Sequence, residues 1–456
     1  MNQFTSINPA TGTEIATYPA TTTAQVEKAL QQSQKTFQAW RKLSFKERGV
    51  VLKNIAKEIR RQKQYLAELA TQEMGKPIQQ SLDEVEKCAR TFDYYAKEGA
   101  RYLADEIIET DARKSFVTYQ PIGVVLAVMP WNFPYWQVFR CMAPILMAGN
   151  VMVLKHASNV SGCALAIAEV IRKSGAPKGL FHTFLLPSAD IEALIGDPGI
   201  QAVTFTGSTA AGSQVAVAAG RHIKKQVLEL GGSDAYVILE DADLDQAVAI
   251  CVSARLVNSG QSCVAAKRFV VVKALKKEFE KRMVEQMQAA TFGDGMNRTN
   301  KIGPMARQDL RDTLHEQVTA SIAMGAKLLC GGTIPDQPGA YYPPTVLTNV
   351  KKGMPAYDEE LFGPVAAIIE AKHEADAIRI ANDSIYGLGG AIFSKDRKRA
   401  EKLAKEELQA GNCFVNASVH SDPRLPFGGA KQSGYGRELG SFGIREFTVV
   451  KTVFIQ

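Results

Sequence analysis

The stretch AVTFTGSTAAG, from Ala202 to Gly212, decides the fold class of this chain. Its first half is apolar and β-branched, as in a buried strand, and a run of helix-forming residues begins near Thr209. A strand that passes through a short turn into a helix is the repeating unit of α/β proteins. The turn at Gly207 and Ser208 would offer free N–H groups to a phosphate, but an ordinary strand-to-helix loop has the same pattern. Both interpretations stay open on this stretch alone.

The rest of the chain repeats this alternation of strand and helix. From about Thr23 to Tyr102 the apolar residues recur at helical spacing, with no strand between them. Strand-like runs then alternate with helical ones, which predicts an α/β protein with a mostly parallel sheet. These runs are Ser115–Val128, Val151–Lys155, Phe181–Leu186, Ala202–Thr206, Gln226–Leu230, Ala235–Leu239 and Arg268–Val272.

Length and composition exclude several classes of protein. A chain of 456 residues is too long for one hydrophobic core, so two or three domains are expected, with a breakpoint at the glycine pair Gly231 and Gly232. No apolar run is long enough to span a membrane, and the first residues lack the pattern of a secretory signal, which predicts a soluble cytoplasmic protein. The net charge of +7 comes partly from basic runs, Lys273–Arg282 and Lys395–Glu407, that interleave acids. Such runs are typical of exposed helix faces, so no nucleic-acid partner is expected.

The seven cysteines are scattered and never form a C-x-x-C pair. Reduced thiols are therefore expected, without a disulfide framework or a metal site. Cys263 lies in the most polar turn, NSGQSC, where small residues leave room around the thiol. An arbitrary cysteine is more often an inert core residue than a nucleophile, and both interpretations are kept for Cys263 at this point.

Two other polar residues lie in unusual places. Glu229 stands in the apolar run QVLEL beside two glycines, where a carboxylate is paired with a cation, has a raised pKa, or faces water at a sheet edge. Asn132 lies between the two prolines of PWNFP, which restrain the backbone if its amide must point at a ligand. A plain loop with a packed Trp131 explains the same residues.

Six motifs in order resemble the NAD(P)-dependent aldehyde dehydrogenase superfamily. They are PWNFP, FTGSTxxG, LELGG, GQSC, EELFGP (Glu359–Pro364) and PFGGxKQSGxGRE (Pro426–Glu438), and the resemblance begins at NPATG, Asn8–Gly12. It implies a Rossmann-like cofactor domain, an α/β catalytic domain and a small β oligomerisation element, in a homodimer or homotetramer. The implied divisions are 1–107 and 122–230 for the cofactor domain, 108–121 for the first part of the oligomerisation element, 231–430 for the catalytic domain, and 431–456 for a C-terminal segment with the second oligomerisation strand.

The resemblance also implies the catalytic roles. Cys263 would attack the aldehyde carbon, and Asn132 would hold the oxyanion with the Cys263 N–H. Glu229 would activate water to release a free acid, since relatives that pass the acyl group to coenzyme A generally lack a glutamate here. Because these residues are present, a catalyst is favoured over a non-catalytic binding or structural protein with this fold, or a thiol acyltransferase or esterase.

For the cofactor, the family pattern assigns a set of contact residues. They are Trp131, Lys155, Ser158, Thr206, Gly207, Ser208, Glu360 and Phe362. NAD-preferring members often carry KPxE where this chain has KHAS, Lys155–Ser158. A serine in place of that glutamate predicts that NADP is preferred and that NAD is possible.

For the substrate, the resemblance is greatest to succinate semialdehyde dehydrogenases. An arginine binds the substrate carboxylate in these enzymes at the position of Arg140, and Ser421 matches a further contact. Trp136 is an expected substrate-binding residue, and Arg424 is a candidate to replace a second arginine, because this chain has Val257 there. Other ω-carboxylated aldehydes such as glutarate semialdehyde, and small aliphatic or amino-aldehydes, are the alternatives.

Overall fold

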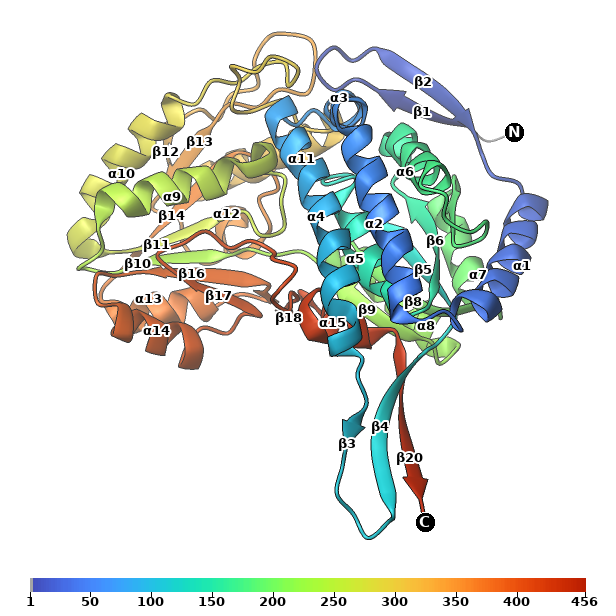
Figure 1. The fold of residues 1–456 in the computed structure, drawn as a ribbon. Helices are drawn as coiled ribbons and strands as arrows, with labels where there is room; N and C mark the ends of the chain where they lie inside the picture. The colour runs from blue at the N-terminus through green and yellow to red at the C-terminus, as the bar shows by residue number, and fades with distance from the viewer. Residues whose placement is uncertain (1–2) are drawn as a thin grey trace.

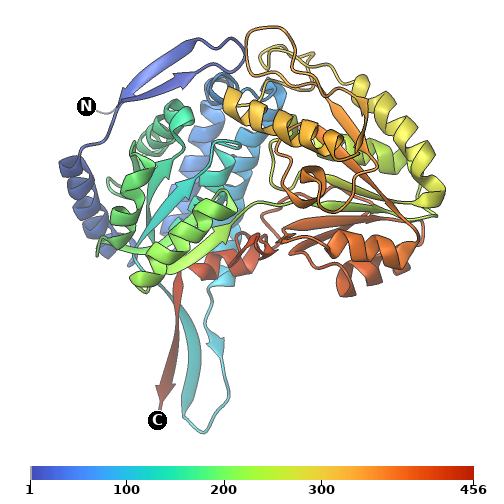
Figure 2. The same ribbon diagram turned by 180° about the vertical axis from the view of Figure 1, so that it is seen from behind.

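The computed structural model describes residues 3–456. Two large sheets lie side by side, each flanked by helices, and a narrow sheet of three strands projects from the body (Figures 1 and 2). The expected α/β fold with mostly parallel sheets is confirmed. Within the described residues, no helix combines the length and the apolar character that a membrane crossing needs.

The stretch from Thr23 to Tyr102 is helical, as predicted. Capping boxes start the first two helices, with Thr22 paired to Gln25 and Ser44 to Glu47. The apolar faces that the sequence spacing predicted are buried, including Trp40 and Ile59. The helices are α1 Thr23–Trp40, α2 Phe45–Arg61, α3 Lys63–Met74 and α4 Ile78–Tyr102.

The first large sheet has six strands in the order β19-β9-β8-β5-β6-β7. Its inner strands pair in parallel, and only β19 is antiparallel, at the edge beside β9. Every residue of β5 and β6 is buried, as expected for strands with helices on both faces. The strands are β5 Val124–Met129, β6 Val151–His156, β7 Phe181–Phe184, β8 Ile200–Thr206, β9 Lys225–Glu229 and β19 Gly434–Tyr435, and the associated helices are α5 Trp136–Met147, α6 Ser161–Lys173, α7 Ile191–Gly196 and α8 Thr209–Arg221.

The second large sheet has seven strands in the order β12-β13-β14-β11-β10-β16-β17. The chain passes from the first sheet to the second between Glu229 and Ala235, the segment that contains the glycine pair. The strands are β10 Ala235–Ile238, β11 Arg268–Val272, β12 Lys327–Cys330, β13 Thr345–Thr348, β14 Val365–Ala371, β16 Gly389–Phe393 and β17 Asn412–Val415. The helices are α9 Leu244–Leu256, α10 Lys273–Gln288, α11 Gln308–Ala323, α12 Pro355–Asp358, α13 Glu374–Asn382 and α14 Arg397–Glu406. Only apolar residues are buried on α10 and α14, so the basic runs lie on the outer faces of helices.

The projecting sheet joins distant parts of the chain. Strand β4 (Lys114–Pro121) pairs with β3 (Glu106–Ile107) on one side and with β20 (Thr448–Ile455) on the other. The strand-like run Ser115–Val128 is therefore divided, because β4 belongs to this sheet and β5 to the six-stranded one. The remaining elements are β1 Gln3–Ile7, β2 Glu14–Pro19, β15 Tyr386–Gly387, β18 Ala430–Lys431, α15 Gly440–Glu446 and the short 3-10 helices Ser158–Val160, Ser188–Asp190 and Val257–Gly260.

Candidate active site

The turn that carries Cys263 has an unusual backbone. Asn258, Ser259 and Gly260 follow α9 with φ angles of 54°, 55° and 77°, all in the left-handed region. Such angles are unfavourable for Asn and Ser, and they persist only where the surroundings impose them. At Gly260 a Cβ atom would lie 2.3 Å from the backbone of Gly363, so no other residue fits there. The turn is therefore packed directly against the EELFGP loop.

Hydrogen bonds impose this backbone and attach Asn132 to it. The Asn258 side-chain amide donates to the carbonyl oxygens of Asn132 (2.6 Å) and Gln261 (2.9 Å). The Asn132 side-chain amide donates to the Gln261 carbonyl at 3.1 Å. Arg255, buried under the turn, donates to the Gly260 carbonyl at 2.6 Å. Asn132 is thus fixed to the carbonyl group two residues before Cys263.

The Cys263 thiol is half-buried. Burial raises the pKa of the Cys263 thiol to about 12. The positive charges of Lys267 and Arg140 favour the thiolate and so oppose part of this increase. The Lys267 ammonium donates to the carbonyl oxygens of Ser262 (2.8 Å) and Cys263 (2.5 Å), directly beside the thiol's own backbone. At neutral pH the thiol is protonated, so its use as a nucleophile needs a base.

Glu229 is buried at the end of β9. Burial, followed by repulsion from Glu438, raises the pKa of Glu229 well above its usual value, and the Arg140 charge offsets only part of this. Its Oε1 is buried and has no hydrogen-bond partner among residues 3–456. Of the alternatives for this carboxylate, water exposure at a sheet edge is excluded, and the raised pKa suits a general base or acid near neutral pH.

A cavity of about 490 Å³ brings together five of the eight expected cofactor residues. The Lys155 ammonium lies in it, 3.4 Å from Oγ of Ser188, and no carboxylate of the described chain lies within 4.0 Å of that ammonium. The N-terminus of α8, capped by Ser208, opens into the same cavity. The five residues are Lys155, Ser158, Thr206, Gly207 and Ser208.

The other three expected cofactor residues lie together in a separate place. The rings of Trp131 and Phe362 meet edge to face, with centroids 5.8 Å apart. Glu360 accepts a hydrogen bond from the Gly232 N–H at 3.0 Å and pairs with Lys267 at 3.2 Å. Since Lys267 also donates to the Cys263 carbonyl, this group lies beside Cys263 rather than in the 490 Å³ cavity.

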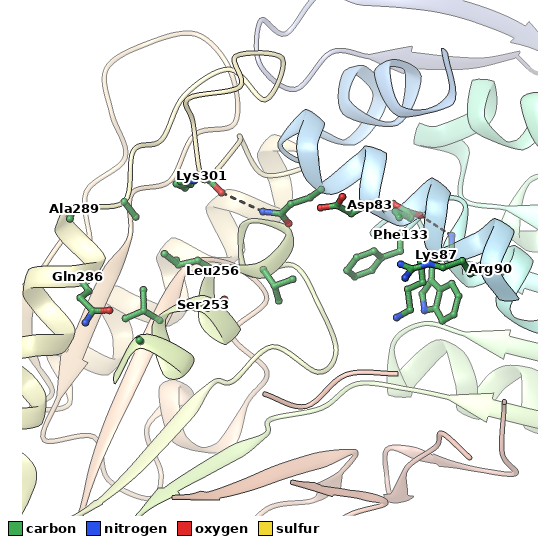
Figure 3. A pocket seen from close by; sticks show the side chains of 16 residues that line it. Asp83, Lys87, Arg90, Phe133, Ser253, Leu256, Gln286, Ala289 and Lys301 are labelled. Atoms are coloured by element: carbon green, nitrogen blue, oxygen red, sulfur yellow. Dashed lines mark hydrogen bonds between the residues drawn. The ribbon is translucent and has the colours of Figure 1, made fainter. Parts of the chain in front are cut away.

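A larger cavity of about 780 Å³ lies between the two halves of the molecule (Figure 3). Side chains of α4, with Phe133, form one wall, and Ser253, Leu256, Gln286, Ala289 and Lys301 lie on the opposite side (Figure 3). Cys263 is not among the wall residues, but Phe133 follows Asn132 in the chain and Val257 precedes the strained turn. The cavity is therefore adjacent to Asn132 and to the turn that carries Cys263.

The four expected substrate residues are only partly brought together. Trp136 lines the large cavity, and the Ser421 hydroxyl accepts a hydrogen bond from Lys87, another residue of that cavity, at 2.9 Å. Arg140 does not line the cavity; it is buried on α5 and its Nε pairs with Glu438. Arg424 is exposed and pairs with Asp422.

The sequence reasoning did not identify three charged residues at this site: Lys87, Lys267 and Glu438. Glu438 is the last residue of a recognised motif, and Lys267 follows the GQSC motif by four residues. A charged residue between the apolar segments VAA and RFVVV is a signal that could have marked Lys267. Lys87 lies in the run DEVEKCAR, which has the usual pattern of an exposed helix face and gives no such signal.

Comparisons with known proteins agree with this geometry. Residues 1–453 match the model of the family described as "Aldehyde dehydrogenase family". The chain is 49% identical over 450 residues to a probable succinate-semialdehyde dehydrogenase [NADP(+)] of Synechocystis, with 99% of each protein covered. It is 44% identical over 449 residues to the succinate semialdehyde dehydrogenase [NAD(P)+] Sad of Escherichia coli K12, with 98% of this chain and 97% of that protein covered.

The likeness extends to three dimensions. The succinic semialdehyde dehydrogenase of Streptococcus pyogenes, solved in complex with NADP+ as the cofactor, superposes with a TM-score of 0.97 at 36% identity, covering 99% of both chains. The fold and the full-length sequence similarity thus lead to the same family. The chain belongs to the aldehyde dehydrogenase family.

Proposed function

We propose that this enzyme oxidises succinate semialdehyde to succinate, with NADP as the preferred cofactor and NAD as a possible one. The observation that carries the reaction type is the strained Cys263 turn, tied to Asn132 and placed near a buried Glu229 of raised pKa. The names of the relatives from Synechocystis and Escherichia coli support the choice of aldehyde and cofactor.

In the first half of the reaction, the Cys263 sulfur forms a bond to the aldehyde carbon. Its proton must leave, and Glu229, whose charge is felt at the thiol, is the proposed acceptor. The Asn132 amide and the Cys263 N–H stabilise the oxyanion that forms on the former aldehyde oxygen; losing one such donor typically costs about 10²- to 10³-fold in rate. A bound NADP would supply the acceptor for the hydride that this carbon then loses.

In the second half, a thioester on Cys263 is hydrolysed. Once Glu229 has released the thiol's proton to solvent, it takes a proton from water, the water oxygen bonds to the acyl carbon, the carbon–sulfur bond breaks, and Glu229 passes its proton to the departing thiolate. Burial raises the pKa of Glu229, which makes the carboxylate a stronger base than an exposed one. The thiol is regenerated and the free acid leaves.

The residues of the 490 Å³ cavity suit a nucleotide with a 2′-phosphate. Burial lowers the pKa of Lys155, so an anion beside this unpaired cation would be stabilising. Ser158, exposed at the cavity, can donate a hydrogen bond to the same phosphate, and the α8 N-terminus at Ser208 suits the pyrophosphate. On the other side, Glu360 with Trp131 and Phe362 would hold the nicotinamide end beside Cys263.

The proposed enzyme is a homodimer or a homotetramer. The projecting sheet of β3, β4 and β20 carries exposed apolar side chains on its last strand, including Val449, Val450 and Phe454. An exposed strand with apolar residues is a ready surface for a second copy of the chain. We propose that this sheet takes part in the subunit contact.

The reaction can be tested by separating its two halves. Glu229→Gln, mixed with NADP and succinate semialdehyde, should form reduced cofactor more slowly than the wild type, because the proposed acceptor of the thiol proton is gone, and should nearly stop at about one equivalent per active site. Intact-protein mass spectrometry should find a succinyl group on this variant. Cys263→Ala should bind NADP but show neither signal. Steady aldehyde-dependent turnover by Cys263→Ala would contradict the proposal, as would a Glu229→Gln variant as fast as the wild type.

A further inference from the structure

Lys87 has surroundings that none of the proposed steps uses. It lies on α4 among the residues that line the 780 Å³ cavity (Figure 3). Its Nζ lies 4.0 Å from the ring centroid of Trp136 and donates to the Ser421 hydroxyl at 2.9 Å. A cation over an indole ring is favourably placed, but the ring does not neutralise the charge.

No carboxylate of residues 3–456 pairs with Lys87 within 4.0 Å. The nearby acids are engaged elsewhere. Glu84 pairs with Lys76 and also accepts from the backbone N–H groups of Tyr135 and Trp136, both at 2.8 Å. Asp422 pairs with Arg424. A positive charge is thus held in a largely apolar wall without its own counter-ion.

The burial of Lys87 and the charges near it make the binding of an anion at its ammonium group more favourable. Burial, followed by repulsion from the charge of Arg140 on α5, lowers the pKa of Lys87 to about 8. The groups whose charge is felt at Lys87 are Cys88 and Glu84 on its own helix, Arg140 on α5 and Asp422 in the loop before β18. A carboxylate bound at Nζ would reduce the cost of keeping the amine charged.

We propose that Lys87, together with Ser421, binds the carboxylate at the far end of the aldehyde substrate. The Ser421 hydroxyl accepts from Lys87 and can donate its own hydrogen to the second carboxylate oxygen. Arg140 is less suited to this task, because its charge is paired with Glu438 away from the cavity walls. The assignment rests on the proposed function, since it presupposes a substrate with a carboxylate.

The test compares succinate semialdehyde with butanal, which has the same number of carbons and no carboxylate. Lys87→Met keeps a side chain of similar length without the charge. It should lower kcat/KM for succinate semialdehyde by about tenfold to 100-fold, and should lower kcat/KM for butanal far less. Lys87→Arg should recover most of the preference. Inhibition by succinate should weaken by a similar factor in Lys87→Met, which reports binding without turnover.

Lys97→Met is the matched control, because Lys97 is an exposed lysine of the same helix and does not line the cavity. Its ratio of the two kcat/KM values should equal that of the wild type. If the wild type prefers succinate semialdehyde and Lys87→Met keeps that preference, the role of Lys87 is refuted while the proposed substrate stands. If the wild type itself treats both aldehydes alike, the proposed substrate and the role of Lys87 both fall.

Discussion

Replacing Ser158 by glutamate tests how this enzyme selects its cofactor. Ser158 is exposed at the 490 Å³ cavity that also holds Lys155, so a carboxylate there would face any 2′-phosphate bound at Lys155. A phosphate monoester carries about −1.5 to −2 charges at pH 7. Two unit charges 4 Å apart repel by about 1 kcal/mol in water and by about 4 kcal/mol at an effective dielectric constant near 20. Because Ser158 is exposed, the lower value applies, and the expected repulsion is about 1.5 to 2 kcal/mol.

That repulsion corresponds to a loss of about tenfold to 30-fold in affinity for NADP. Two measurements should show it in Ser158→Glu: the dissociation constant of NADP from isothermal titration calorimetry, and kcat/KM with NADP at saturating aldehyde. Activity with NAD should hold or improve, because a carboxylate can accept hydrogen bonds from ribose hydroxyls. The loss should shrink in 1 M salt, where the Debye length falls to about 3 Å.

Ser158→Gln is the matched control, since glutamine has nearly the size of glutamate and no charge. If Ser158→Gln loses as much NADP affinity as Ser158→Glu, the effect is steric and the electrostatic reasoning is refuted. A wild type that favours NAD, or a Ser158→Glu variant that weakens both cofactors equally, would refute it as well.

The remaining predictions concern the buried charges near the thiol and the cavity. Arg140→Ala leaves Glu438 buried without its cation, which typically costs about 3 to 5 kcal/mol of stability. The same variant should lower kcat/KM for succinate semialdehyde and for butanal alike. A loss confined to succinate semialdehyde would instead show that Arg140 binds the substrate carboxylate. The pKa of Lys87 is lowered to about 8, so its charged form is present below pH 8 and is lost above it. The ratio of kcat/KM for succinate semialdehyde to that for butanal should therefore fall as the pH rises through about 8 in the wild type, and a ratio that falls equally in Lys87→Arg, which stays charged, would refute this assignment.

The elements of the fold could be predicted well from local pattern. Apolar residues recur at helical spacing in the helices from Thr23 to Tyr102 and form continuous runs in the buried strands. Both patterns are clear because the surroundings of each element stay the same along its length. The division of Ser115–Val128 between two sheets was not visible, since both parts are β-branched and the division depends on pairing with a strand at the other end of the chain.

The site residues could be predicted where one motif contains both the turn and the polar side chain that it presents. Outside such motifs, the surroundings of a residue could not be predicted. The small residues of NSGQSC predicted a sharp turn at Cys263, and the apolar flanks of Glu229 left burial with a raised pKa as one of three alternatives, which the structure favours. The surroundings of Arg140 and Lys87 depend on which side chains from other elements reach them. A lysine within an acidic and basic helical run looks exposed in one dimension, and only the approach of Trp136 and Ser421 covers it.

The pairing of β20 with β4 has a consequence for the order of events during synthesis. Strand β4 leaves the ribosome early, but one of its two neighbours, from Thr448 to Ile455, emerges only after both large sheets have been translated. Over that interval the nascent chain displays an open strand edge, the kind of surface at which chains cross-pair and aggregate. The edge strand β19 beside β9, and Glu438 beside Arg140, also arrive in this final segment. The surroundings of Glu229 therefore reach their final electrostatic state only when the last part of the chain has docked.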